Sequence, residues 1–336
     1  MTEPTTDPAA RSTHRRAVGR ALEAARRVAV QYSGVGIVLV ALCAYLSATQ
    51  KNFATWDNVT IILSQQAVLM VVAVGLTFVL IVGGLDLSMG GMLGLAGVTT
   101  WGLTEHGVPV PLTFVIVVAG AFVLGAVTNG FLIARLRLSF LVVTLGTGVA
   151  FGAIALIITQ GQTKSLLSSG DLLVIGSGGI GTLPWIVIVA VGLLVLSALV
   201  LRYTGFGRMI YATGGNQEAA RLAGINVVVV RLMVYAISSA FAATAGVLEA
   251  AHLASADPQS GKTIVLDAAA AVLIGGTSFL GGSGTMLGTF LGVLFLGVLS
   301  NGLTRLDISS YWNGFITGAV LIFALLVDRL RYRGTR

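Results

Sequence analysis

The chain has 336 residues, of which 56% are hydrophobic and only 10% are charged. Soluble domains carry roughly 25% charged residues, so this composition excludes an ordinary soluble enzyme or binding module. The formal net charge of +7 is not gathered into a basic patch with aromatic residues, which argues against nucleic-acid binding. Because apolar runs repeat almost end to end, we predict one all-α, polytopic membrane domain.

The predicted elements begin with a polar, arginine-rich segment over residues 1–30, interpreted as a disordered cytosolic tail rather than a cleaved signal peptide. A membrane domain follows over 31–328, and a basic cytosolic tail over 329–336 ends the chain. The pairs of spans at 61–104 and 264–303 are joined by short glycine-rich turns, so ten predicted spans could also be read as eight. The ten candidates cover residues 32–48, 61–82, 87–104, 110–134, 139–160, 184–201, 231–251, 264–280, 285–303 and 312–328.

The basic residues predict the orientation of these spans. Suppose that the N-terminus is cytoplasmic and that ten spans alternate. Four of the 20 basic residues then lie outside, namely Lys51, Lys164, Lys262 and Arg305, and the other sixteen lie inside. This asymmetry is what the positive-inside rule describes. It predicts a cytoplasmic N-terminus, a cytoplasmic C-terminus and a cytoplasmic loop over 202–231.

The loop 202–231 contains the pattern of a short helix. Asn216 can cap it, Glu218 lies in the first turn, where the helix dipole favours an acid, and Gly224 can end it. A small, weakly apolar helix of this kind is suited to lying in a groove of another protein, although a merely solvated loop is the alternative. We therefore predict a docking site for a partner at Asn216, Glu218, Ala219, Ala220 and Gly224.

The sequence lacks the motifs of an enzyme. It has no Gly-x4-Gly-Lys-Ser/Thr phosphate loop and no Gly-x-Ser-x-Gly elbow. Its three histidines are far apart in the sequence, so no metal site is predicted. Cys43 is the single cysteine, which excludes an intrachain disulfide. We predict no catalysis on this chain.

One local pattern occurs twice. Residues 79–84 and 272–276 each place a run of aliphatic residues before two glycines, and each is followed by a Met-Leu-Gly triplet in the next span. Internal repeats with interrupted helices are typical of transporters. Independent use of glycine in a chain with 44 glycines is the alternative.

Three blocks of sequence carry a resemblance to a known family. Residues 83–90, GGLDLSMG, resemble the GGIDLSVG signature of bacterial sugar ABC-importer permeases of the ribose, xylose, galactose and autoinducer-2 type. Residues 212–225 are similar to the cytosolic loop of that family, and residues 266–284 resemble a third block. The matches are collinear over roughly 58–328. This sequence differs from the family pattern at Leu85, Met89 and Thr213, and these differences do not identify the sugar that is transported. The signature that contains Asp86 argues against the more distant branched-chain amino-acid permeases.

The resemblance implies a permease subunit of the bacterial cytoplasmic membrane, with 31–328 as its permease domain and 202–231 as its coupling loop. It implies three partners: a second permease subunit, identical or related, an extracytoplasmic solute-binding protein, and a cytosolic ATPase that uses ATP and Mg²⁺. No cofactor is expected on this chain. We expect import of a neutral sugar or sugar-like solute, because all arginines lie at span edges or in loops.

Polar residues inside or beside the spans are candidates for the solute path, with hydrogen bonds between helices as the alternative for each. For Asp86 the favoured reading is capping of the next helix by Asp86 or Ser88. Glu249 and Asp267 are predicted near the outer face, at the entrance or against the binding protein, with a solvated rim as the alternative. A proton- or sodium-coupled transporter that uses Asp86, Asp267 or Glu249 is the alternative function, but it leaves the helix 216–224 without a task. The path candidates are Gln65, Gln66, Asp86, Asn129, Thr144 and Asn301.

Overall fold

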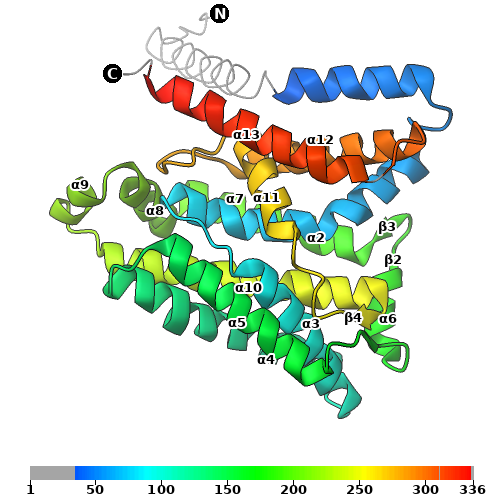
Figure 1. Cartoon of the computed structure of the whole chain (residues 1–336), viewed down its shortest axis with the longest axis horizontal. Coiled ribbons are helices and arrows are strands. Elements are labelled where there is room, and N and C mark those ends of the chain that lie inside the picture. The colour runs from blue at the N-terminus through cyan, green and yellow to red at the C-terminus, as the bar shows by residue number, and fades with distance from the viewer. Residues whose placement is uncertain (1–34, 310, 334–336) are drawn as a thin grey trace, which may run out of the picture.

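The computed structural model describes residues 35–309 and 311–333, which form a bundle of helices lying mostly along the long axis of the molecule (Figure 1). The predicted tail over 1–30 lies outside the described residues. In chain order the helices are Val35–Thr49, α2 (Trp56–Ile81), α3 (Met89–Glu105), α4 (Val110–Gly125), the π-helix η1 (Ala126–Arg135), α5 (Phe140–Thr159), α6 (Gly170–Ser177), α7 (Trp185–Tyr203), α8 (Gly205–Gly215), α9 (Gln217–Leu222), α10 (Val227–Leu253), α11 (Ile264–Ile274), α12 (Met286–Arg305) and α13 (Tyr311–Arg333).

Six helices of the described chain are long and apolar enough to cross a membrane: α2, α4 continued by η1, α5, α7, α10 and α12. The chain is therefore an all-α membrane protein. Each of the ten predicted segments overlaps a helix, but a crossing by all ten stays a prediction. The segment 264–280 differs most, because α11 ends at Ile274 and is too short to cross alone. The predicted tail over 329–336 also starts inside α13, which continues to Arg333.

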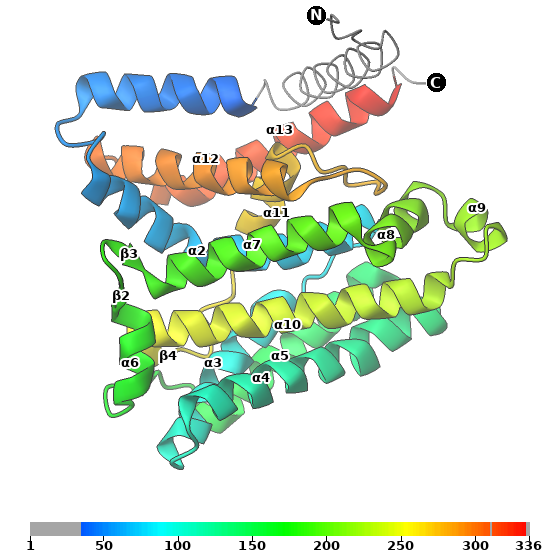
Figure 2. The same cartoon turned by 180° about the vertical axis from the view of Figure 1, so that it is seen from behind.

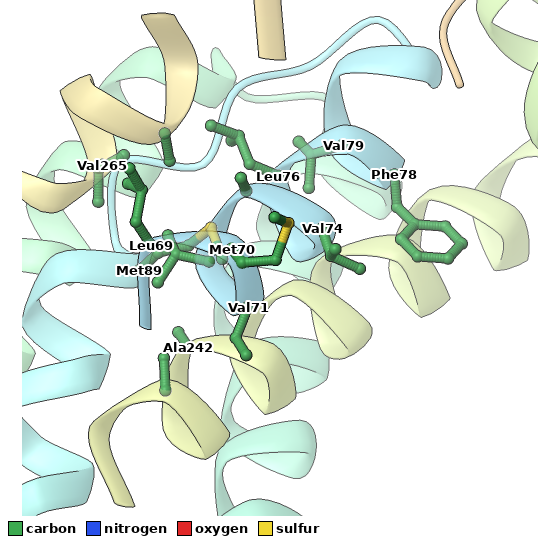
Figure 3. Close-up of a cluster of buried hydrophobic side chains, with 14 of the residues drawn as sticks. Leu69, Met70, Val71, Val74, Leu76, Phe78, Val79, Met89, Ala242 and Val265 are labelled. Carbon is green, nitrogen blue, oxygen red and sulfur yellow. The ribbon is translucent and has the colours of Figure 1, made fainter. Parts of the chain in front are cut away.

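The core of the bundle is built around α2. Nearly every side chain from Ala67 to Ile81 is buried, which is the pattern of a helix that neighbours surround on all sides. Figure 3 shows the side chains of α2 meeting Met89 of α3, Ala242 of α10 and Val265 of α11. By contrast, α4 and α5 expose many valines, leucines and isoleucines, which suits contact with lipid.

The two ends of the bundle differ in structure. α8, α9 and the C-terminal end of α13 lie at one end, which we call the α9 end (Figures 1 and 2). The opposite end, called the α6 end, holds α6 and two short antiparallel strand pairs. In these pairs β1 (Lys164–Ser165) joins β4 (Ser255–Ala256), and β2 (Gly179–Ile180) joins β3 (Leu183–Pro184). The described chain thus places its longest polar loop, 202–231, at the α9 end.

Candidate functional site

The two repeated glycine motifs form the same helix-ending structure. After α2, the backbone N–H groups of Gly83 and Gly84 donate to the carbonyls of Leu80 and Val79, both at 2.9 Å. After α11, Gly276 and Thr277 donate in the same way to Leu273 and Val272, at 3.0 and 3.2 Å. Gly83 and Gly276 have φ values of 81° and 86°, a left-handed conformation that favours glycine. The same pair of bonds also ends α3, α5, α9 and α12, so this turn is a general helix ending of the chain, and the internal repeat stays a prediction.

The first glycine turn leads into a buried polar network centred on Asp86. One carboxylate oxygen of Asp86 accepts hydrogen bonds from the backbone N–H and the hydroxyl of Ser88, at 3.0 and 2.5 Å. The other oxygen accepts from the hydroxyl of Ser238 on α10, at 2.7 Å. Asn129 of η1 donates to the Ser88 hydroxyl at 2.7 Å and to Asp86 at 3.3 Å. All four side chains are fully buried.

The network extends to α5 and so joins four parts of the chain. The hydroxyl of Thr147 donates to the side-chain oxygen of Asn129 at 2.6 Å, and Thr144 lies 3.5 Å from the carbonyl oxygen of Leu85. The carboxylate of Asp86 thus ties the link between α2 and α3 to η1 and α10, and Asn129 carries the tie to α5. A wide π-helical turn at a buried asparagine is a common sign of a functional position.

This geometry bears on three of the predicted path residues. Asp86 and Asn129 bind one another within the network, whereas the hydroxyl of Thr144 donates to the backbone carbonyls of Phe140 and Leu85 beside it. Ser88 stands at the start of α3 without a capping bond from its own side chain, whereas Asp86 binds the backbone of Ser88. Asp86 thus holds the residue that precedes α3 and caps no N–H group of the helix itself, so its structural role is in the buried network and differs from the predicted cap. The sequence reasoning missed Ser238, although the Ser238-Ser239 pair in an apolar helix is a visible polar signal.

α8 packs against the end of α2 and against residues 281–284 in the link between α11 and α12. Gly214 lies so close to α2 that an added Cβ would overlap the carbonyl oxygen of Ile81. The same carbonyl accepts a hydrogen bond from the backbone N–H of Gly282, at 2.8 Å. The hydroxyl of Tyr211 donates to the carbonyl of Gly284, at 2.7 Å. The end of α2, the link between α11 and α12, and α8 therefore meet in one backbone junction.

α9 forms where the sequence predicted a short helix. The side chain of Asn216 accepts a hydrogen bond from the backbone N–H of Ala219 at 3.0 Å, which confirms the predicted cap. Gly224 follows the helix with a φ of 84°, and Glu218 pairs with Arg221 at 3.6 Å. Ala220 is buried, whereas Ala219 and Leu222 face outward, and Leu222 is 80% exposed. The exposed surface of α9 is a small apolar patch beside an ion pair.

A cavity of about 390 Å³ lies among the middle of α2, the start of α11, the second half of α12 and the start of α13. It brings together Gln66, predicted for the path, and Asp267, predicted for the entrance. Three leucines of α2 and α12 form its apolar lining. The polar groups that line it are those of Gln66, Thr263, Asp267, Ser300 and Thr317.

The remaining predicted residues lie apart from these sites. Asn301 exchanges hydrogen bonds with Asn58, and Arg305 donates to Asn58 at 2.6 Å, so this cluster ties α12 to the start of α2. Gln65 is exposed on the surface of α2. Glu249 is half-buried near the end of α10, and one of its carboxylate oxygens has no hydrogen-bond partner. The structure does not bring Gln65, Glu249 or Asn301 to the Asp86 network.

An all-α membrane bundle with glycine-ended helices and an exposed polar loop is typical of a polytopic transport protein. Residues 58–325 match the family described as branched-chain amino acid transport system, permease component. The chain is 37% identical to the ribose import permease protein RbsC of Escherichia coli K12, over 87% of this chain and 92% of that protein. It is 35% identical to RbsC of Bacillus subtilis (89% and 93%) and 33% identical to the galactose/methyl galactoside import permease MglC of Escherichia coli K12 (89% and 94%).

The chain belongs to this family of ABC-importer permeases, and its relatives place it with the sugar import permeases. It is a multi-pass protein of the bacterial cytoplasmic membrane, from a family of transport permeases and not of enzymes. No solved structure matches it. The comparisons give no support to a proton- or sodium-coupled transporter.

Proposed function

We propose that this chain is the membrane-spanning subunit of an ATP-driven importer for a neutral sugar or sugar-like solute. The observation that carries the proposal is the exposed helix α9, joined through α8 to the backbone junction of the end of α2 with the link between α11 and α12. Its outward surface is apolar at Leu222 and charged at Glu218 and Arg221, as expected of a helix that lies in a groove of a partner. The names of the relatives, which import ribose and galactosides, support the solute class.

The partners follow from this assignment. A cytosolic ATPase, which binds ATP and Mg²⁺, would receive α9, with Asn216, Ala219, Ala220 and Gly224 setting the shape and position of the helix. A second permease subunit would complete the membrane unit, and an extracytoplasmic solute-binding protein would dock at the α6 end. ATP-driven closure of the ATPase would then move α8 and α9 as a rigid body.

The proposal requires ten spans, with the α9 end in the cytoplasm. Reporter domains inserted after Ala223 or fused after Arg336 should read cytoplasmic, and one inserted after Ser168 should read external, in agreement with the asymmetry of basic residues. Ala223 and Ser168 are exposed, so insertions there disturb little packing, whereas the nearby Thr213 is fully buried. An external signal after Ala223 would refute both the orientation and the docking of a cytosolic ATPase.

Uptake of radiolabelled solutes by a strain that lacks the chromosomal permease gene tests the function. With its ATPase and binding protein co-expressed, the permease should restore uptake of at least one neutral pentose, hexose or polyol. A matched strain with an ATPase variant that cannot hydrolyse ATP should show none. Preferential uptake of a phosphosugar or a branched-chain amino acid would reject the solute class, and uptake without ATP hydrolysis would reject the ATP-driven mechanism.

A further inference from the structure

We propose that the cavity among α2, α11, α12 and α13 is a binding site for the solute, in which the carboxylate of Asp267 accepts hydrogen bonds from sugar hydroxyl groups. The inference rests on the proposed function, because it names where the imported sugar would bind in the permease. The cavity volume of about 390 Å³ lies within the range of roughly 300–1,000 Å³ that is usual for small-molecule sites.

The lining of the cavity suits the two chemical surfaces of a sugar. A sugar ring has an edge of hydroxyl groups and faces of C–H bonds. Leu69, Leu296 and Leu299 offer apolar contacts for such a face. Groups that can hydrogen-bond to the hydroxyl edge line the same cavity: one carboxylate, one amide and three hydroxyl groups, those of Asp267, Gln66, Thr263, Ser300 and Thr317.

The charge of the lining selects among solute classes. Among the described residues that line the cavity, none is a lysine or arginine, and the single ionisable group is the carboxylate of Asp267. A phosphosugar or other anion would meet this acid without a compensating cation. A neutral polyol can donate two hydroxyl groups to one carboxylate, and such charge-assisted bonds are stronger than neutral ones.

The position of Asp267 in the fold makes it available for this role. It lies in the first turn of α11, it is half-buried, and its carboxylate hydrogen-bonds to Thr317 of α13. The side chain of Gln66 packs against Gly297 of α12, where the absence of a Cβ leaves room for it. These two groups, from helices far apart in the sequence, thus reach the same cavity, whereas the Asp86 carboxylate is already occupied by its own network.

The test compares Asp267→Asn with the wild type for the sugar that the wild type imports, ribose or galactose, and for its monodeoxy analogues. The binding protein and the ATPase are the same throughout. If a hydroxyl group binds Asp267, the variant should lose about tenfold of its discrimination between the sugar and one of these analogues, because a hydrogen bond to a charged group is removed. Asp57→Asn, the same change at an exposed position in the first turn of α2, should keep the wild-type discrimination.

Permease abundance and association with the binding protein are measured beside uptake. If Asp267→Asn lowers uptake of all sugars equally, or acts through lost association with the binding protein, Asp267 is a structural or docking residue and the inference is wrong. Unchanged uptake and discrimination would also overturn it. These results differ from failure of the proposed function, in which the wild type itself imports no neutral sugar.

Discussion

Replacement of Asp86 by alanine is expected to abolish uptake and to reduce the amount of folded permease in the membrane. The change removes the acceptor for the backbone and hydroxyl of Ser88 and for the hydroxyl of Ser238, all of which are buried. Each buried polar group left without a partner costs about 1–3 kcal/mol, so a loss of about 3 kcal/mol or more in the free energy of unfolding is expected. The start of α3 would also lose its tie to α10.

The effect is measured as permease abundance in membranes and as the unfolding temperature of the purified protein in detergent. Asp171→Ala is the matched control, because Asp171 is exposed in the first turn of α6 and should tolerate the same change. Ser238→Ala removes one bond only and should fall between the two. An Asp86→Ala protein with the stability and uptake of the wild type would show that the network contributes nothing.

Leu222→Asp should reduce uptake at least about tenfold while the permease remains folded. Leu222 is 80% exposed on α9, so the substitution removes no internal packing and should change stability by about 0.5 kcal/mol or less. In the proposed complex with an ATPase, it would place a charge where an apolar contact is expected, and loss of a contact at the centre of an interface commonly costs about 2 kcal/mol or more. Glu218→Lys should likewise reduce uptake, because it reverses a charge on the exposed surface of α9 and breaks the ion pair with Arg221.

The measurement combines uptake with co-purification of the ATPase at equal permease abundance. Leu167→Asp is the control, since Leu167 is 70% exposed in the segment between β1 and α6, at the opposite end of the molecule. Normal uptake and ATPase binding in both α9 variants would make α9 a solvated loop. Gly224 is a poor probe of docking, despite its exposure, because its φ of 84° makes any side chain there strained and would disturb the cap of α9.

Local sequence signals predicted the elements of this fold well. Hydropathy located a helix in each predicted span, and Asn216 and Gly224 marked the two ends of α9. The repeated glycine pairs identified two equivalent helix endings. These features depend on residues close together in the chain, so their physical cause is visible in the sequence.

Contacts between distant segments could not be predicted in the same way. Asp86 was identified as a candidate, but its partner Ser238 lies 152 residues away, and only the packing of α10 against the turn after α2 brings them together. Likewise, Gln66 and Asp267 were assigned to separate roles, and the structure places both at one cavity. The helix predicted over 264–280 was too long because α11 ends at Ile274, before the two glycines that begin the turn.

The junction at α8 has a mechanical consequence. Gly214 rests on the carbonyl of Ile81, and that carbonyl is bonded to Gly282, so backbone touches backbone with no side chain between them. Contacts between long side chains can absorb a small displacement by changing rotamers, whereas closely packed backbone has little slack. A movement of α8 would therefore reach the α2–α3 pair and the α11–α12 pair with little loss, and the two pairs would move in phase rather than one after the other.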